Sequence, residues 1–186
     1  DLMQEEFGQG QGRLALFFTH THWDHIMGLP FFIPLFQKVN LFHLHTARLP
    51  DSDIQGIFSG VFNEDIFPVP FEQLESTIRL TELVPPTTVT WGDAEIRCMQ
   101  INHNNVTLGY RVQNNGKSFT VLSDNAIIDL VLMGGGFEEA AAEDREGFIE
   151  GYRERQAAFA KGTDVLVCDT HFTAKTIKGR EHWGHS

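Results

Sequence analysis

Four side chains that bind metal ions well lie within six positions of the segment LALFFTHTHWDHIMGLPFF, residues 14–32. They are His20, His22, Asp24 and His25. An apolar run leads into this group, so the group follows a buried strand. On a loop after a strand, His20 and His22 are two positions apart and can converge on one point. Imidazole and carboxylate together suit a borderline divalent ion such as Zn²⁺, so we predict a metal site here.

The number of these ligands indicates two ions rather than one. Four candidate ligands in six residues exceed what a single site needs from one segment, so two ions are expected to share the loop. The alternative is a polar strand end that only caps the next helix. A helix cap needs one such residue and not four, and we therefore favour the metal site.

The elements that must position these ligands read as strands alternating with helices. Residues 12–18 form a continuous apolar run, which predicts a strand buried on both faces. Pro30 and Pro34 predict a short or broken helix over residues 26–37. A helix over residues 51–62 would be capped by Asp51 or Ser52. Other predicted strands cover residues 39–46, 76–83, 94–102, 106–113, 118–124 and the buried run 163–172.

Turn and helix-end signals complete this outline. Asn115-Gly116 predicts a hairpin between two strands. The longest helical stretch, residues 138–162, ends at Gly162. Residues 134–136 are three glycines that predict a flexible loop, and no phosphate-binding Gly-Lys-Ser/Thr ending follows them. Two mixed sheets with outer helices fit this order.

Composition limits the classes of protein to which the chain can belong. A length of 186 residues with 41% hydrophobic residues predicts one globular, soluble domain, and no apolar segment is long enough to span a membrane. A net charge of −11 argues against a surface that wraps nucleic acid. Cys98 and Cys168 are expected to be reduced thiols of a cytoplasmic protein, with a disulfide as the alternative. The chain opens on Asp1, so a missing N-terminus and a targeting segment stay open.

The segment THTHWDH resembles the His-x-His-x-Asp-His signature of the metallo-β-lactamase-fold hydrolases. INHNNVTLGYRV and FTVLSDN resemble the family's third histidine motif and its bridging-carboxylate motif. DVLVCDTHF and HWGHS resemble later motifs of the branch with phosphodiesterases and tRNA 3′-processing endonucleases. The resemblance implies an α/β fold, the αββα sandwich of two mixed β-sheets with outer helices. The metals would lie at one edge between the sheets.

The resemblance also implies a role for each residue. His20, His22 and His103 would bind the first metal, and Asp24 and His25 the second. Asp124 would bridge both ions. His185, oriented by Asp169, would donate a proton to the leaving group, so the catalytic set is Asp24, His185 and Asp169. His185 could instead be a metal ligand or a loop histidine.

Two features depart from the family pattern. The family's N-terminal strands should precede residue 14, where little room remains, and a further metal histidine should follow Ser186. We therefore expect residues 1–186 to be a single metallo-hydrolase domain that is a piece of a larger one. With one ligand of the second site outside the chain, the first site is expected to fill first and hold its ion more tightly.

The implied function is a dinuclear-metal phosphodiesterase that uses a metal-bridging hydroxide on a small phosphodiester such as a cyclic nucleotide. The two ions are most simply Zn²⁺, with Mn or Fe as alternatives. A lactonase or thioesterase on the same site is one alternative, and an inactive binding or sensor module is another. The net charge disfavours a tRNA nuclease or another nucleic-acid partner. The sequence predicts no membrane partner, and it leaves the exact substrate and a homo-oligomer open.

Other residues that could do chemistry are given structural roles. His43 and His45 alternate on one strand face and are expected to face solvent or the rim of the core. Trp23, Phe31, Phe32 and Phe36 are expected to pack the core near the site rather than stack on a base. His171 and His182 lie near the predicted proton donor without a motif that assigns them a role.

Overall fold

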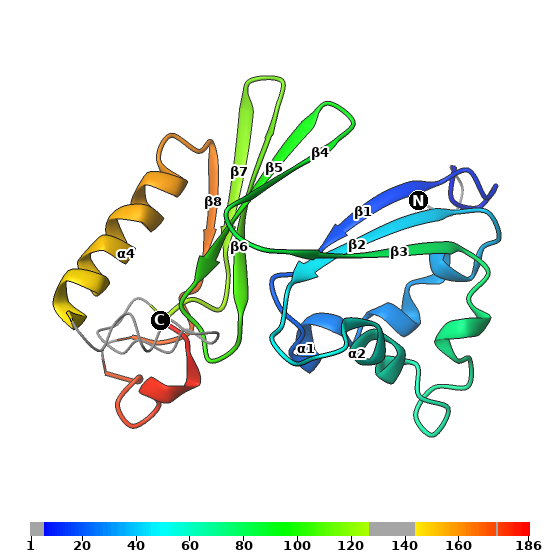
Figure 1. The fold of residues 1–186 in the computed structure, drawn as a ribbon, viewed down its shortest axis with the longest axis horizontal. Helices are drawn as coiled ribbons and strands as arrows, with labels where there is room; N and C mark the ends of the chain where they lie inside the picture. The colour runs from blue at the N-terminus through cyan, green and yellow to red at the C-terminus, as the bar shows by residue number, and fades with distance from the viewer. Residues whose placement is uncertain (1–5, 127–143, 174) are drawn as a thin grey trace. The chain divides into compact units, whose positions relative to one another are not determined.

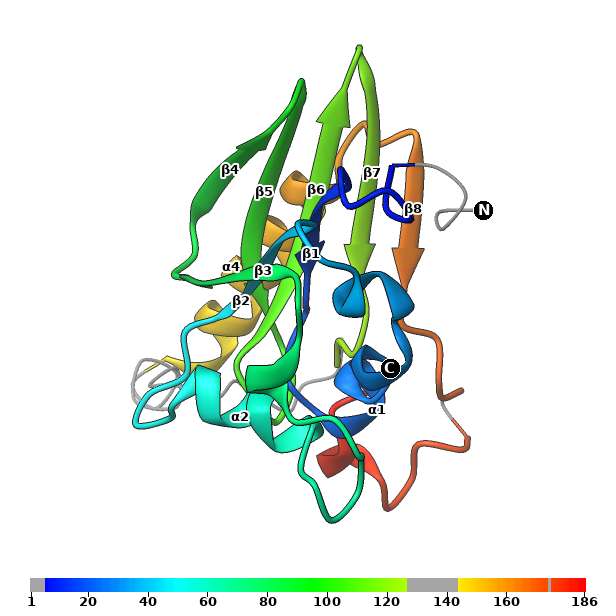
Figure 2. The same cartoon turned by 90° about the vertical axis from the view of Figure 1, so that its right-hand side faces the viewer.

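The computed structural model describes residues 6–126, 144–173 and 175–186. The chain divides into two compact units, Asp1–Leu83 and Val84–Ser186, and each unit is built on one sheet (Figures 1 and 2). We call them the first and the second unit. The sequence predicted an α/β fold of the αββα class, and the two sheets with their helices agree with that prediction. The predicted 134–136 loop and the predicted helical residues 138–143 lie outside the described residues.

The first unit holds a parallel sheet of three strands in the order β1-β2-β3. Prolines open both 3₁₀ segments that follow the histidine loop, so the predicted broken helix is confirmed. The elements are β1 (Arg13–Phe17), α1 (Trp23–Ile26), η1 (Leu29–Phe31), η2 (Ile33–Phe36), β2 (Leu41–Ala47), α2 (Ile54–Val61), η3 (Phe71–Gln73) and β3 (Thr77–Leu83).

Alternation along β2 decides which of its faces meets the core. Phe42 and Leu44 are buried in one hydrophobic cluster with Phe58 of α2, whereas His43 and His45 occupy the alternate positions. His45 is 5% exposed and stacks on Phe17, with ring centroids 4.5 Å apart. Solvent exposure is therefore wrong for His45, and burial lowers its pKa because the charged imidazolium loses hydration.

The cap of α2 differs from the prediction. Asp53 is the N-cap, and its side chain accepts a hydrogen bond from the backbone N–H of Gln55 at 3.0 Å. Asp51 instead takes a positive φ of 58° in the preceding turn. Three neighbouring residues, 51–53, all have side chains that suit a cap, so local sequence could not choose among them.

Asn40 joins three segments of the first unit. Its side chain is fully buried, and its Oδ1 accepts the backbone N–H of Gly12 at 2.9 Å. Its Nδ2 donates to the carbonyl oxygens of Phe7 at 3.0 Å and Pro34 at 3.1 Å. These bonds fix the turn before β1 and the start of η2 against the start of β2.

We expect Asn40→Ala to lower the free energy of unfolding by about 3 kcal/mol, because three buried backbone groups lose their partner. Asn63→Ala is the matched control, since its side chain accepts one hydrogen bond at an exposed turn. Chemical denaturation measures both variants. Equal stability of the two variants would contradict the role of Asn40.

The second unit holds a mixed sheet of five strands in the order β4-β5-β6-β7-β8, with α4 along one face (Figures 1 and 2). Strands β4, β5, β6 and β7 pair antiparallel with one another in that order, and β8 pairs parallel with β7. The prediction of mixed sheets thus holds here, whereas the described strands of the first sheet are all parallel. The elements are β4 (Thr87–Trp91), β5 (Ala94–Ile101), β6 (Thr107–Asn114), β7 (Lys117–Leu122), α4 (Arg145–Ala160), β8 (Val165–Cys168) and η4 (Glu181–Trp183).

Local signals placed most turns of this unit correctly. Asn115 and Gly116 have positive φ angles of 48° and 73°, as the predicted β6–β7 hairpin requires. Gly162, with a φ of 69°, follows the end of α4 as predicted. Strand β4 was not predicted.

Two burial predictions are wrong. Strand β8 was expected to be buried, but Val165 is 52% exposed and Leu166 47%. Strand β1 is only half-buried rather than covered on both faces. Both strands stand at an edge of their sheet in the described part of the chain, and a continuous apolar run does not reveal an edge position.

Of the four aromatic residues predicted to pack the core, two do so and two do not. Phe32 and Phe36 pack against the first-unit core as predicted. Trp23 and Phe31 are 53% and 75% exposed, so core packing is wrong for them. Each of these two lies in a helical segment of three or four residues, which is too short to turn every apolar side chain inward.

Both cysteines are free thiols, in agreement with the sequence. Cys98 is buried on β5 and Cys168 is half-buried at the end of β8. Among the described residues, the search for a helix both long enough and apolar enough to span a bilayer finds none.

Candidate metal centre

The first unit gathers three imidazoles on the loop after β1 and on the short helix α1. His20 is fully buried, and its Nε2 lies 2.7 Å from Nδ1 of His22. The rings of His20 and His25 have centroids 4.2 Å apart. Thr19 Oγ1 lies 3.1 Å from His20 Nδ1, so this threonine can hold the ring while Nε2 points toward His22. The predicted convergence of His20 and His22 is confirmed within this unit.

Asp24 lies at the outer side of the same loop. Its Oδ2 is 3.4 Å from His25 Nε2, and its side chain is 75% exposed. The carboxylate can therefore reach an ion beside His25 with little loss of hydration. Among the described residues, Asp24 belongs to none of the groups of three ligand atoms that lie within 4.8 Å of one another.

The second unit brings His103 against the segment near residue 184. His103 follows β5, is 1% exposed, and its Nδ1 lies 2.8 Å from the carbonyl oxygen of Gly184. A carbonyl only accepts, so Nδ1 carries the proton and Nε2 presents its lone pair. A Cβ at Gly184 would come within 2.4 Å of His103 Nδ1, so the close approach requires glycine.

Asp124 and His185 lie near Nε2 of His103. Asp124 Oδ2 lies 3.9 Å from His103 Nε2, and ligand atoms of His103, Asp124 and His185 all lie within 4.8 Å of one another. Asp124 takes a φ of 52°, in the left-handed region that few non-glycine residues adopt. Backbone strain of this kind is common at functional sites.

Asp169 orients His185. Its Oδ2 accepts from His185 Nδ1 at 2.7 Å and from the backbone N–H of Asn125 at 3.1 Å. Its Oδ1 accepts from the backbone N–H of His171 at 3.0 Å. Because Nδ1 donates to the carboxylate, Nε2 of His185 is left to face the cluster. The predicted His185–Asp169 contact is present.

Two further histidines, His171 and His182, lie on the segment that carries His185. The ring centroids of His171 and His185 are 5.0 Å apart, and His182 is exposed on η4. Sequence reasoning missed Gly184 and Asn125, which hold His103 and Asp169. Gly184 stood inside the quoted HWGHS motif, but only the folded chain shows that its carbonyl meets His103.

The donor chemistry of both units fits divalent metal ions. In the second unit, His103, Asp124 and His185 combine imidazole nitrogens with a carboxylate, which is a ligand set of zinc sites. In the first unit, His20, His22 and His25 supply imidazole nitrogens. Hydrogen bonding at the other nitrogen of His103 fixes the tautomer that can bind an ion.

Comparisons with known proteins agree with this fold. A family model described as the beta-lactamase superfamily domain matches residues 10–141. No curated protein sequence gives a significant match.

Three solved structures resemble the chain. Human tRNase Z, short form, has a TM-score of 0.59 and 14% identity, over 92% of this chain and 63% of its own. The metallo-β-lactamase fold protein YhfI from Bacillus subtilis has a TM-score of 0.50 and 14% identity, over 87% of this chain and 52% of its own. Zn²⁺-bound PqqB from Methylobacterium extorquens has a TM-score of 0.50 and 15% identity, over 92% of this chain and 53% of its own.

These three likenesses support the fold alone, because the identities are low. The chain spans between 52% and 63% of the length of these three structures. The family model covers well over half of the chain and includes the histidine loop, His103 and Asp124. The chain therefore belongs to the β-lactamase superfamily, and its two sheets with their helices have the metallo-β-lactamase fold.

Proposed function

We propose that the protein is a dinuclear-metal hydrolase that cleaves small phosphodiesters. The observation that carries this proposal is the His185–Asp169 pair beside His103 and Asp124 in the second unit. An oriented imidazole next to a metal-ligand set is suited to protonate an alkoxide leaving group. Phosphodiesters with poor leaving groups need such an acid.

In this proposal His20, His22 and His103 hold the first ion, and Asp24 and His25 hold the second. Asp124 would be shared by both ions, since its carboxylate has two oxygens. Family membership, the approach of His20 to His22 and the group of His103 with Asp124 support this assignment. Zinc is the preferred ion, because imidazole is the dominant donor.

When bound, such ions supply a water of lowered pKa and neutralise charge on the phosphoryl oxygens. The residues of the chain do the rest. Asp169 keeps the proton of His185 on Nδ1, which leaves Nε2 to hold and deliver the proton for the leaving oxygen. Gly184 holds His103 in the tautomer whose Nε2 is a ligand.

Charge favours a phosphate in this site. Two divalent ions bring four positive charges, and Asp24 and Asp124 remove two of them. The remaining local positive charge attracts an anion even though the chain carries a net charge of −11. A cyclic nucleotide is one substrate of this class.

Turnover of an aryl phosphodiester, an aryl ester and a lactone, with metal content determined on the same sample, tests the proposal. We expect the phosphodiester to have the highest kcat/KM, and a chelator to abolish its turnover until zinc is restored. Preferred hydrolysis of the ester or the lactone would assign a lactonase or thioesterase instead. Bound metal without any turnover would indicate a sensor module.

A further inference from the structure

One hydroxyl on helix α4 joins the two loops that carry the second-unit ligands. Tyr152 Oη accepts the backbone N–H of Asn102 at 2.9 Å and donates to Asn125 Oδ1 at 2.7 Å. It also accepts the side-chain amide of Gln156 at 3.0 Å. A phenolic oxygen has one proton and two lone pairs, so its bonding capacity is fully used.

Two of these three partners are chain neighbours of candidate ligands. Asn102 precedes His103, and Asn125 follows Asp124. The loops are also tied to each other, because Asn102 Nδ2 donates to the carbonyl of Ala126 at 2.9 Å. The backbone N–H of Ala126 donates back to the Asn102 carbonyl at 2.8 Å. The hydroxyl therefore anchors to α4 a pair of loops that are already hydrogen-bonded to each other.

The same contacts support the strained backbone of Asp124. A non-glycine residue with a φ of 52° keeps that conformation only where its surroundings impose it. The side chain of Asn125 is held by Tyr152, while its backbone N–H donates to Asp169 Oδ2 at 3.1 Å. The network thus runs from α4 past Asp124 to the carboxylate that orients His185.

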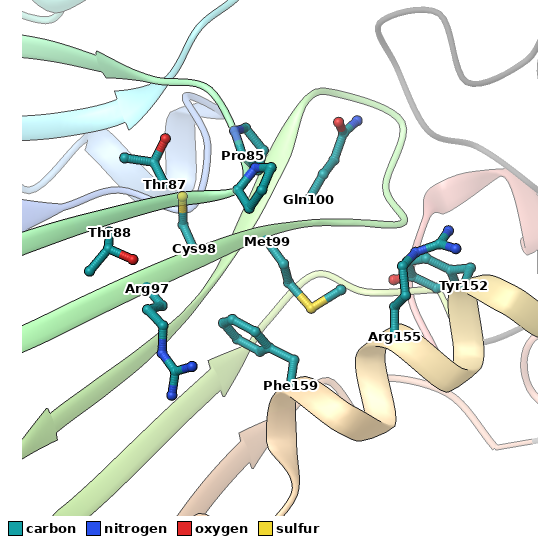
Figure 3. A pocket seen from close by; sticks show the side chains of 11 residues that line it. Pro85, Thr87, Thr88, Arg97, Cys98, Met99, Gln100, Tyr152, Arg155 and Phe159 are labelled. Atoms are coloured by element: carbon teal, nitrogen blue, oxygen red, sulfur yellow. The ribbon is translucent and has the colours of Figure 1, made fainter.

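Tyr152 is a buried residue, only 6% exposed, on helix α4. Its side chain lines a cavity of about 480 Å³ between α4 and the start of the sheet, together with Met99 and Phe159 (Figure 3). Burial raises the pKa of Tyr152 above its ordinary range, so the hydroxyl keeps the proton that it donates to Asn125.

We infer that Tyr152 is a positioning residue that sets the separation of His103 and Asp124 by holding Asn102 and Asn125. The inference rests on the proposed metal-dependent function, because it concerns ligands of that site. Tyr152 touches neither a ligand nor the proton donor directly in the contacts described above, and it acts through their chain neighbours.

Tyr152→Phe tests the inference, and Tyr110→Phe is its matched control. Tyr110 is the other tyrosine of the chain and is buried on β6 opposite Cys98. We expect Tyr152→Phe to weaken zinc affinity by about 10–100-fold, the usual effect of losing a residue that supports a metal ligand. The kcat should fall with little change in KM, and Tyr110→Phe should leave both zinc affinity and kcat near those of the parent protein.

A double variant checks that the effect runs through Asn125. If Tyr152 and Asn125 act as one unit, Tyr152→Phe with Asn125→Ala should lose no more zinc affinity than the larger single loss. Should Tyr152→Phe fail to fold, Gln156→Met removes one bond to the hydroxyl and keeps the ring, and it should shift zinc affinity in the same direction.

The outcomes separate the inference from the proposed function. A parent protein that binds no zinc would overturn the proposed function and the inference with it. A parent that binds zinc and hydrolyses the diester, with equal zinc affinity in the two Tyr→Phe variants, would overturn the positioning role alone. A simple additive loss in the double variant would overturn the route through Asn125.

Discussion

His22→Ala and His103→Ala are each expected to lose most of the metal of the first site and nearly all hydrolytic turnover. Each would remove one neutral imidazole from an ion held by three of them, His20 included. Residues that merely support a metal ligand are worth about 10–100-fold in affinity, so loss of a ligand itself should exceed that range. Metal content after dialysis against a weak chelator, measured with turnover on the same sample, gives the answer.

His182→Ala is the control for these two variants. This histidine is exposed on η4 and belongs to neither cluster described above. It should keep full zinc and normal turnover. Full zinc with near-normal turnover in His22→Ala or His103→Ala would show that the ligand assignment is wrong.

His185→Ala is expected to reduce turnover by about 10²–10⁴-fold, the usual worth of a positioned general acid, while the metal content stays intact. The loss should shrink for a diester with a nitrophenolate leaving group, because that group departs without a proton. Asp169→Asn should show the same dependence on the leaving group, since its carboxylate orients the His185 ring. Rates on a matched pair of aryl and alkyl diesters measure the effect.

His171→Ala controls for general disturbance of this loop. Its ring is a close neighbour of His185, but its hydrogen bond to Asp169 is made by the backbone N–H and survives the substitution. It should leave the leaving-group dependence unchanged. An equal loss on both substrates in His185→Ala would refute the proton-donor role, and loss of zinc would make His185 a ligand instead.

The sequence predicted the parts of the site that are local in the chain. His20, His22 and His25 converge because they stand within six residues after one strand, a relation visible without a structure. The hairpin at Asn115-Gly116 and the end of α4 at Gly162 followed from residues that tolerate a positive φ. The contact of His185 with Asp169 spans 16 residues and was predicted only through the family resemblance.

The parts that the sequence missed depend on distant contacts. Tyr152 meets Asn102 across 50 residues, and Gly184 meets His103 across 81. A tyrosine on a polar helix and a glycine near a histidine carry no local sign of such partners. The exposure of β8 was missed for a related reason, because an apolar strand looks the same at the edge of a sheet and at its centre.

The backbone of Asp124 has an evolutionary consequence. Glycine would adopt its φ of 52° without strain, whereas aspartate, like asparagine, tolerates it at some cost, so folding alone favours glycine over aspartate. Only a use for the carboxylate offsets that preference, in the way that functional sites commonly trade stability for activity. Among related chains that keep this turn, aspartate at this position should therefore mark lineages still selected for metal binding. Glycine or asparagine there should mark lineages that keep the fold but are no longer selected for metal binding.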